Sequence, residues 1–178
     1  DADTVGTASV AADAEICMMA ADILARLGLV QGGADREFVI YVNNRKLLDG
    51  VMESAGLAGP DHAATRLSVL RAIDKLDKFP ASEVKKLLGK GRLDDSGDFT
   101  NGAGLSDEQT ETIMGFVDFR SLESSDAQAN TATLAALKAS AFIDNQSFAA
   151  GVEELETIAA LTAAAGYDSS VIAIAPYI

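Results

Sequence analysis

Segments with strand-forming composition lie near both ends of this chain, and the region between them has an almost entirely helical pattern. EFVIYVN at 37–43 and SSVIAIAPYI at 169–178 are short runs of β-branched, aromatic and other apolar residues, which favour strands. The polar stretch DADTVG at 1–6 is also expected to be extended. From about residue 59 to 146 the spacing of apolar residues indicates helices, without an internal repeat. This order predicts a mostly helical α+β chain in which a helical block is inserted into a sheet domain.

Apolar residues recur at helical spacing in several segments, which are expected to form helices: 9–27, 43–57, 66–78, 82–91, 106–119, 125–142 and 147–167. Residues 92–104, RLDDSGDFTNGAG, are rich in Gly and Asp and are expected to form a loop. Two helix starts carry the spacing of a capping box, Ser106 with Gln109 and Ser125 with Gln128.

The composition is that of a globular protein with an aliphatic core. Of the 178 residues, 48% are apolar but only 6% are aromatic, and Trp is absent. No apolar run is long enough to span a bilayer, and the acidic first residues do not form a secretory signal. The single Cys17 cannot form an internal disulfide, which is typical of a reducing cytoplasm, and the single His62 cannot supply a histidine-rich metal site. We therefore expect no metal site and no membrane association.

The charge is distributed unevenly. The formal net charge is −13, yet eight of the fourteen Lys and Arg residues lie between positions 66 and 92, where only three acids occur. This window carries +5, and the rest of the chain carries −18. A strongly acidic protein normally repels phosphate, but one basic segment gives it a face that can bind polyanions.

Most of these cations are candidates for contacts with RNA phosphates. On a helix over 66–78, three of them would share one face at spacing i, i+4, i+7, and four more would extend the patch into the next helix and loop. The seven candidates are Arg71, Lys75, Lys78, Lys85, Lys86, Lys90 and Arg92. Each paired phosphate would release counterions and add affinity. The alternative is a solvated helix face that is partly neutralised by Asp74 and Asp77, and the sequence leaves both readings open.

A second candidate site lies at the start of the chain. On an extended backbone, Asp1 and Asp3 face the same side roughly 7 Å apart. Their carboxylates could accept N–H donors from a cationic or heterocyclic ligand, or hold a metal. The alternative is two solvated acids.

Several segments together resemble the histidyl-tRNA synthetase family of class II aminoacyl-tRNA synthetases. The matching segments occur in the family's order and spacing: DADTVG, DAE at 13–15, VNNRKLLDG, AIDKLDK and AAGYDSSVIAIAPYI. The resemblance implies an antiparallel-sheet catalytic core, here residues 1–58 and 147–178, interrupted by an all-α insertion domain at 59–146. It also implies a ligase that joins histidine to ATP as an adenylate and then transfers it to tRNA.

The resemblance also assigns the candidate residues. Asp3 matches a pocket acid that recognises histidine, and Asp1 lies on the same face. The seven cations would contact the acceptor arm of tRNA(His) through the insertion domain. The complete enzyme would use ATP and Mg²⁺ and would be a cytoplasmic homodimer.

The family's other motifs do not occur in this sequence. Motif 1, the motif 2 arginine, the catalytic arginine motif and motif 3 are missing, and the chain begins with Asp1 and no methionine. We therefore expect an internal fragment that carries no catalytic residue and no cofactor and is inactive alone. Two alternatives stay open: the synthetase-like regulatory subunit of ATP phosphoribosyltransferase, and a free-standing RNA-binding module.

Overall fold

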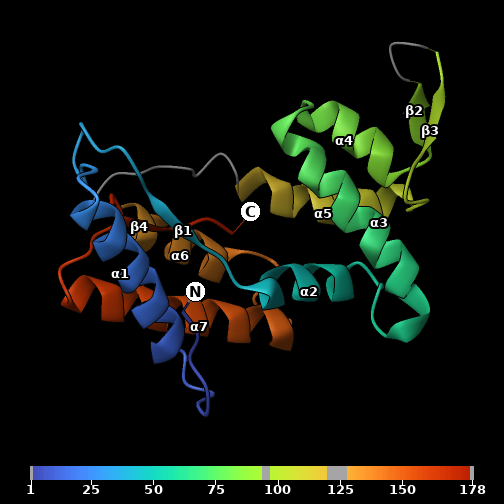
Figure 1. Cartoon of the computed structure of the whole chain (residues 1–178). Helices are drawn as coiled ribbons and strands as arrows, with labels where there is room; N and C mark the ends of the chain where they lie inside the picture. The colour runs from blue at the N-terminus through green and yellow to red at the C-terminus, as the bar shows by residue number, and fades with distance from the viewer. Residues whose placement is uncertain (1, 94–96, 120–127, 177–178) are drawn as a thin grey trace.

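The computed structural model describes residues 2–93, 97–119 and 128–176, and its ribbon forms two lobes joined by one helix (Figure 1). The first, which we call the sheet lobe, contains α1 (Ala11–Arg26), β1 (Ile40–Val42), α6 (Ala129–Ala139), α7 (Gln146–Ala164) and β4 (Ile172–Ile174). The second, which we call the basic lobe, contains the elements between residues 60 and 117. The joining helix α2 (Arg45–Ser54) contacts α7 on one side and α5 (Asp107–Val117) on the other.

The two strands of the sheet lobe pair in parallel. Ile40 lies opposite Ile172 and Val42 opposite Ile174. The antiparallel core expected from the resemblance is therefore not found for this pair, the only strands described in the sheet lobe. A parallel pair needs a long crossover, and here every element from α2 to α7 lies between the two strands in the chain. All of β4 is buried, whereas Tyr41 at the centre of β1 is 45% exposed.

Residues 2–9 form no strand, so the strand expected within residues 1–6 is not found among the described residues. Val5 is 88% exposed, so this stretch has no buried apolar face that would hold it against a neighbouring strand. Regular structure begins with α1, as predicted from its helical spacing. The small side chains of Ala14 and Ala21 are fully buried where α1 packs against α7 and the strand pair.

Close contact between α2 and α7 depends on two glycines. A Cβ added to Gly50 would lie 2.6 Å from the backbone nitrogen of Phe148, and one added to Gly151 would lie 3.1 Å from the backbone nitrogen of Leu47. The start of α2 is capped by Asn44, whose side chain accepts a hydrogen bond from the Lys46 amide at 3.0 Å. The joining helix is therefore fixed firmly to the sheet lobe.

The basic lobe combines short helices with a hairpin. Its elements before α5 are η1 (Pro60–His62), α3 (Ala63–Ile73), η2 (Asp74–Asp77), α4 (Ala81–Leu88), β2 (Gly91–Leu93) and β3 (Phe99–Asn101). The single helix expected over 66–78 is thus wrong: α3 ends at Ile73 and continues as a 3₁₀ turn. The Lys78 amide donates to the Lys75 carbonyl at 2.9 Å, the i to i−3 pattern of a 3₁₀ turn. Pro80 restricts only the residue before it, so it limits how far this helical run can extend and does not cause the change at Asp74.

The segment 92–104 is not a loop throughout, and the basic lobe is not all-α. β2 and β3 pair antiparallel with Arg92 opposite Thr100. After β3, the amides of Gly102, Ala103, Gly104 and Leu105 donate to the carbonyls of Lys90, Leu87, Gly89 and Leu88 at 2.8–3.2 Å. These bonds satisfy carbonyls that the end of α4 would otherwise leave without partners. The capping box of Ser106 with Gln109 is present at the start of α5, whereas Ser125 lies outside the described residues.

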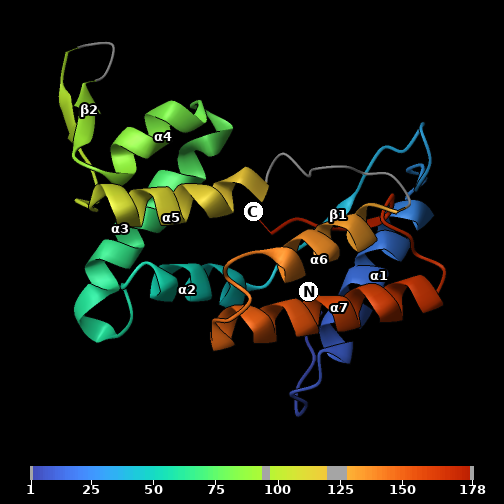
Figure 2. The ribbon, with the colours of Figure 1, turned by 180° about the vertical axis from the view of Figure 1, so that it is seen from behind.

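One hydrophobic core extends through both lobes. Val51 of α2, Val69 of α3, Val84 of α4 and Leu155 of α7 belong to the same buried cluster. The two lobes are distinct in outline when seen from either side (Figures 1 and 2), yet they share this interior.

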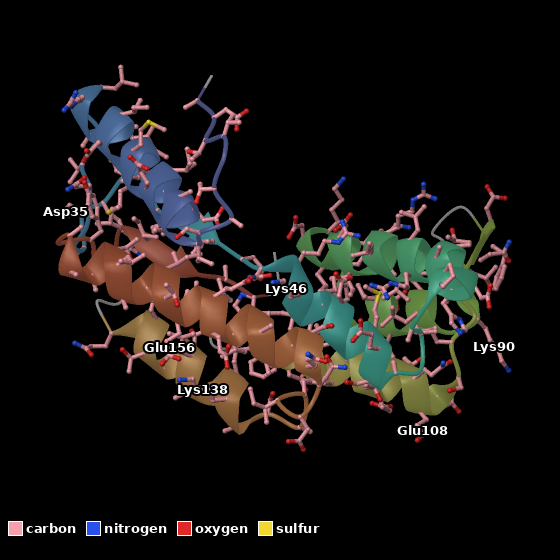
Figure 3. The ribbon with its side chains drawn as sticks, turned by 90° about the horizontal axis from the view of Figure 1, so that it is seen from below. Asp35, Lys46, Lys90, Glu108, Lys138 and Glu156 are labelled. Carbon is pink, nitrogen blue, oxygen red and sulfur yellow. The ribbon has the colours of Figure 1, made fainter. Side chains whose placement is uncertain are left out.

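Helix α6 packs in the sheet lobe, although it falls within the expected helical block. It contacts α7 and β4, and its Lys138 forms an ion pair of 2.5 Å with Glu156 of α7 (Figure 3). Its first turn also holds β4: Asn130 Nδ2 donates to the Ile172 carbonyl at 2.9 Å, and the Ile174 amide donates to Asn130 Oδ1 at 2.8 Å. One side chain thus supplies a donor and an acceptor to the edge of β4 that does not pair with β1.

Candidate nucleic-acid interface

The seven predicted cations all lie in the basic lobe, but they do not share one helix face. Arg71 belongs to α3, Lys75 to η2, and Lys78 follows η2. The helix-face prediction for these three is wrong because α3 ends before Lys75. Lys85 and Lys86 lie in the last turn of α4, and Lys90 and Arg92 lie at the start of the hairpin. Figure 3 shows Lys90 at the end of the basic lobe farthest from the sheet lobe.

Three of the seven cations are in ion pairs within the chain. Lys85 pairs with Glu111 of α5, and both Lys86 and Arg92 pair with Glu83, at 2.6 and 2.8 Å. Hydrogen bonds from Lys86 and then from Arg92 lower the pKa of Glu83 below its ordinary value. These pairs match the neutralised-surface reading, although the partners are Glu83 and Glu111 and not the expected Asp74 and Asp77.

Arg92 has a structural environment. Its side chain is only 14% exposed, and its guanidinium carbon lies 4.1 Å from the centroid of the Phe79 ring. This cation–π contact and the ion pair with Glu83 fix the first strand of the hairpin against the end of η2. A guanidinium held in this way is poorly placed to follow an RNA backbone.

The other four cations have no ion pair within the described part of the chain: Arg71, Lys75, Lys78 and Lys90. Lys75 is half-buried and the other three are exposed. These four residues, which we call the unpaired cations, keep the phosphate-binding reading. The neighbouring Arg66, by contrast, pairs with Asp49 and ties α3 to the joining helix.

Two of the unpaired cations line a cavity of about 190 Å³ between α3, η2 and the residues after β3. Besides Arg71 and Lys75, the cavity is lined by Ser68, Asn101 and Gly102 among other residues. Sequence reasoning missed Ser68 and Asn101. Ser68 is signalled by its spacing of three residues from Arg71 on a helix, but Asn101 is brought in only by the hairpin.

Asp3 lies elsewhere, beside the start of α1 in the sheet lobe. It is exposed and lines a hollow of about 300 Å³ with Thr4, Thr7, Ser9 and Asp13 among other residues. Asp13 is a second acid that the sequence interpretation did not assign to this site. Asp1 lies outside the described residues, so its pairing with Asp3 stays a prediction.

The described residues contain no side-chain cluster suited to binding a metal ion, and their single cysteine is not placed for thiol catalysis. No group of three or more His, Cys, Asp or Glu side chains converges there in a way that could hold a metal ion. Cys17 is partly buried against Ala21, Val171 and Ile172, and burial, followed by the nearby Asp13 charge, raises the pKa of its thiol. It packs as a core residue and is not activated as a nucleophile. None of the described helices is both long and apolar enough to cross a membrane.

The chain is 51% identical over 176 residues to a protein named histidine–tRNA ligase from Rhizobium meliloti, covering 99% of this chain and 32% of that protein. A histidine–tRNA ligase from Bradyrhizobium diazoefficiens is also 51% identical, with 99% and 33% covered. The crystal structure of histidyl-tRNA synthetase from Nostoc sp. PCC 7120 superposes with a TM-score of 0.69 at 25% identity, over 97% of this chain and 34% of that one. The chain is homologous to part of a histidyl-tRNA synthetase.

No family model matches this sequence, so the relationship rests on these relatives. The family resemblance read from the sequence segments is confirmed. The chain spans about a third of the length of the histidine–tRNA ligases that it matches. The mostly helical α+β architecture, with its two small sheets, is likewise shared with the synthetase structure.

Proposed function

We propose that this chain acts as part of a histidine–tRNA ligase, which activates histidine with ATP and transfers it to tRNA. The observation that carries the proposal is the 51% identity to the Rhizobium meliloti ligase over 99% of the chain. The superposition on the Nostoc synthetase supports it. In the complete ligase we place ATP, histidine and tRNA(His) as ligands, a homodimer as the assembly and the cytoplasm as the location.

We further infer that the sheet lobe belongs to the class II catalytic core and that the basic lobe belongs to the insertion domain. The expected boundaries were residues 1–58 and 147–178 for the core and 59–146 for the insertion. The contacts of α6 with α7 and β4 favour a revised boundary, with 129–139 belonging to the core. The antiparallel sheet of the core would then involve strands contributed from elsewhere in the complete ligase.

Contact with the acceptor arm of tRNA(His) is proposed for the basic lobe. The unpaired cations Arg71, Lys75, Lys78 and Lys90 are its best candidates, because each can neutralise a phosphate without giving up an internal ion pair. Lys85, Lys86 and Arg92 are weaker candidates, since RNA would compete with Glu111 and Glu83 for them.

Titration with tRNA(His) at several salt concentrations tests this contact. The chain should bind tRNA, and the affinity should fall as salt rises, because counterions are released from neutralised phosphates. Replacing Lys78 and Lys90 by Gln should weaken binding and flatten the salt dependence, whereas Lys86→Gln serves as the matched control with its charge already paired. Binding that does not respond to salt would remove phosphate contact from the proposal.

Recognition of histidine is proposed for Asp3, with Asp1 on the same segment. A carboxylate can accept the N–H of an imidazole and disfavours isosteres that lack one. In the complete ligase, Asp3→Ala should raise the histidine concentration needed for adenylate formation more than the ATP concentration needed. Steady-state exchange between ATP and pyrophosphate measures both, and an effect confined to ATP would overturn the assignment.

The chain alone is proposed to lack ligase activity. Charge at the α-phosphate of ATP is stabilised in such chemistry by arginines and Mg²⁺, and the described residues contain neither the family's arginine motifs nor a cluster that could hold the metal. Mg²⁺ is therefore assigned to residues that the complete ligase would supply. Histidine-dependent exchange of pyrophosphate into ATP by this polypeptide would contradict the proposal.

A further inference from the structure

The cavity beside α3 is unusual for so acidic a protein. Its lining includes the cations Arg71 and Lys75, the polar side chains of Ser68 and Asn101, and no carboxylate. The chain carries 27 acidic residues against 14 Lys and Arg, yet the charged residues that line this cavity are all cations. One water occupies roughly 30 Å³ in the liquid, so about 190 Å³ accommodates a tetrahedral anion with some of its hydration.

Arg71 and Lys75 oppose each other electrostatically in the absence of an anion. Both line the same cavity without a carboxylate beside them, and like charges held near each other repel. Neither has an ion-pair partner among the described residues. An anion in the cavity would neutralise both side chains and remove this repulsion.

The walls of the cavity are held in place by backbone contacts. Ala103 donates to the Leu87 carbonyl at 2.8 Å, and a Cβ added to Gly102 would lie 2.2 Å from the Gly89 carbonyl oxygen. Ala72 on the opposite wall is buried. Because these walls are fixed before any ligand arrives, little conformational freedom would be lost on binding.

We propose that this cavity is a binding site for a single phosphate group. Arg71 supplies a planar fork of N–H donors suited to two phosphate oxygens, and Lys75 supplies a second positive charge. The Asn101 side-chain amide offers a further donor. Ser68 already donates its hydroxyl to the Ala64 carbonyl at 3.1 Å, so it borders the site without contributing a free donor.

The source of the phosphate follows from the proposed function, on which this part of the inference rests. In the complete ligase the group would be a backbone phosphate of the tRNA acceptor arm, held between α3 and the hairpin. Lys78 and Lys90 lie outside the cavity lining and would contact neighbouring phosphates less specifically. Phosphate binding itself does not depend on that assignment.

Titration of the chain with inorganic phosphate, at constant ionic strength against chloride, tests the site by amide chemical shifts. The amides of Asn101, Gly102 and Ala103 should shift and saturate in the wild type. Arg71→Gln, and independently Lys75→Gln, should weaken phosphate binding about tenfold or more, since each removes a charge-assisted hydrogen bond to the anion. Lys138→Gln is the control, a cation of the sheet lobe that lies outside the cavity lining and outside the proposed tRNA contact, and it should leave the titration unchanged. Equal effects of all three variants, or shifts scattered over the lobe, would overturn the site.

A second experiment tests the phosphate site and the proposed function separately. An RNA hairpin that mimics an acceptor arm, and independently ATP, are added as competitors of inorganic phosphate. RNA should compete with phosphate for the same amides, and Arg71→Gln should reduce the salt slope of RNA binding by about 0.7–0.9, the value for one phosphate contact. Phosphate binding without RNA binding would leave the site standing and contradict the tRNA contact. RNA binding that is unaffected by Arg71→Gln would keep the contact and remove the site from it. Competition by ATP and not by RNA would assign the phosphate to a nucleotide.

Discussion

At the scale of single residues, Glu83 forms ion pairs with two cations, Lys86 and Arg92, and so links α4 to the hairpin of the basic lobe. Because the pKa of its carboxyl is lowered in the folded protein, the carboxylate contributes stability above the unfolded pKa of about 4.3. That contribution is lost as pH falls through the folded pKa. Glu83→Gln should therefore lower the melting temperature at pH 7, and its difference from the wild type should vanish in acid.

Thermal melts of both proteins between pH 7 and pH 3 measure this effect. Glu153→Gln is a suitable control, because Glu153 is an exposed glutamate of α7 with no ion pair among the described residues. A Glu83→Gln difference that stays constant down to pH 3 would show that the side chain acts through packing and not through its charge.

Asn130 is the residue that holds β4 at its open edge. Asn130→Ala would leave the buried Ile172 carbonyl and Ile174 amide without these partners, at a cost of about 1–3 kcal/mol for each unsatisfied group. Asn130→Asp should also be less stable than the wild type: it keeps the acceptor for the Ile174 amide but places a carboxylate oxygen against the Ile172 carbonyl oxygen, which repels it. Urea unfolding measures the free energies, with the exposed neighbour Thr131→Ala as control. Equal stability of all four proteins would show that β1 pairing alone fixes β4.

At the scale of the elements, the close contact between α2 and α7 is possible because glycines at the contact have no side chain. Gly50→Ala would place a Cβ 2.6 Å from the backbone nitrogen of Phe148 in α7 and from Oδ1 of its N-cap residue Asn145, so the helices must separate, at a cost of about 1–3 kcal/mol. Gly115→Ala in α5 is the matched control, because its nearest neighbour would be Phe142 Cζ at 3.9 Å. There the better helix propensity of Ala should stabilise the protein by up to about 1 kcal/mol. Opposite signs in chemical denaturation are the expected result.

The features of the elements that could be predicted from the sequence are those that depend on residues close together in the chain. The capping box of Ser106 with Gln109 involves residues within one turn, and it was predicted. The expected helix end at residue 78 also relied on local pattern, whereas the change from α-helix to 3₁₀ turn at Asp74 was not predicted. The parallel pairing of β1 with β4 joins residues far apart in the chain, and no local pattern specifies its direction.

The candidate site was predictable in outline only. Charge clustering located the basic lobe, since it depends on composition alone. Whether a cation is paired depends on which acid the fold brings within reach. Glu111 reaches Lys85 across two helices, and Asn101 enters the cavity through the hairpin. Such partners are set by tertiary packing, which explains why three of the seven cations could not be separated from the other four.

At the scale of the whole molecule, α2 makes the two lobes one cooperative unit. Its buried side chains belong to the core that runs into both lobes, Arg66 pairs with Asp49, and Gln109 Nε2 donates to the Ala55 carbonyl at 3.0 Å. The basic lobe should therefore not unfold separately, as a domain joined by a mobile linker would. Helical and tertiary spectroscopic signals should follow a single transition.

Met52→Ala tests this coupling directly, because Met52 is 1% exposed and lies in the shared core. Truncating a buried Met costs about 2–5 kcal/mol, and in one cooperative unit that loss is felt wherever exchange requires global unfolding. The slowest-exchanging amides of α3 and α7 should lose hydrogen-exchange protection by the same factor. Leu67→Ala, at a position 48% exposed, should change neither. If only one lobe loses protection, then the basic lobe moves independently of the strands, and it could reposition on a bound tRNA without disturbing the core.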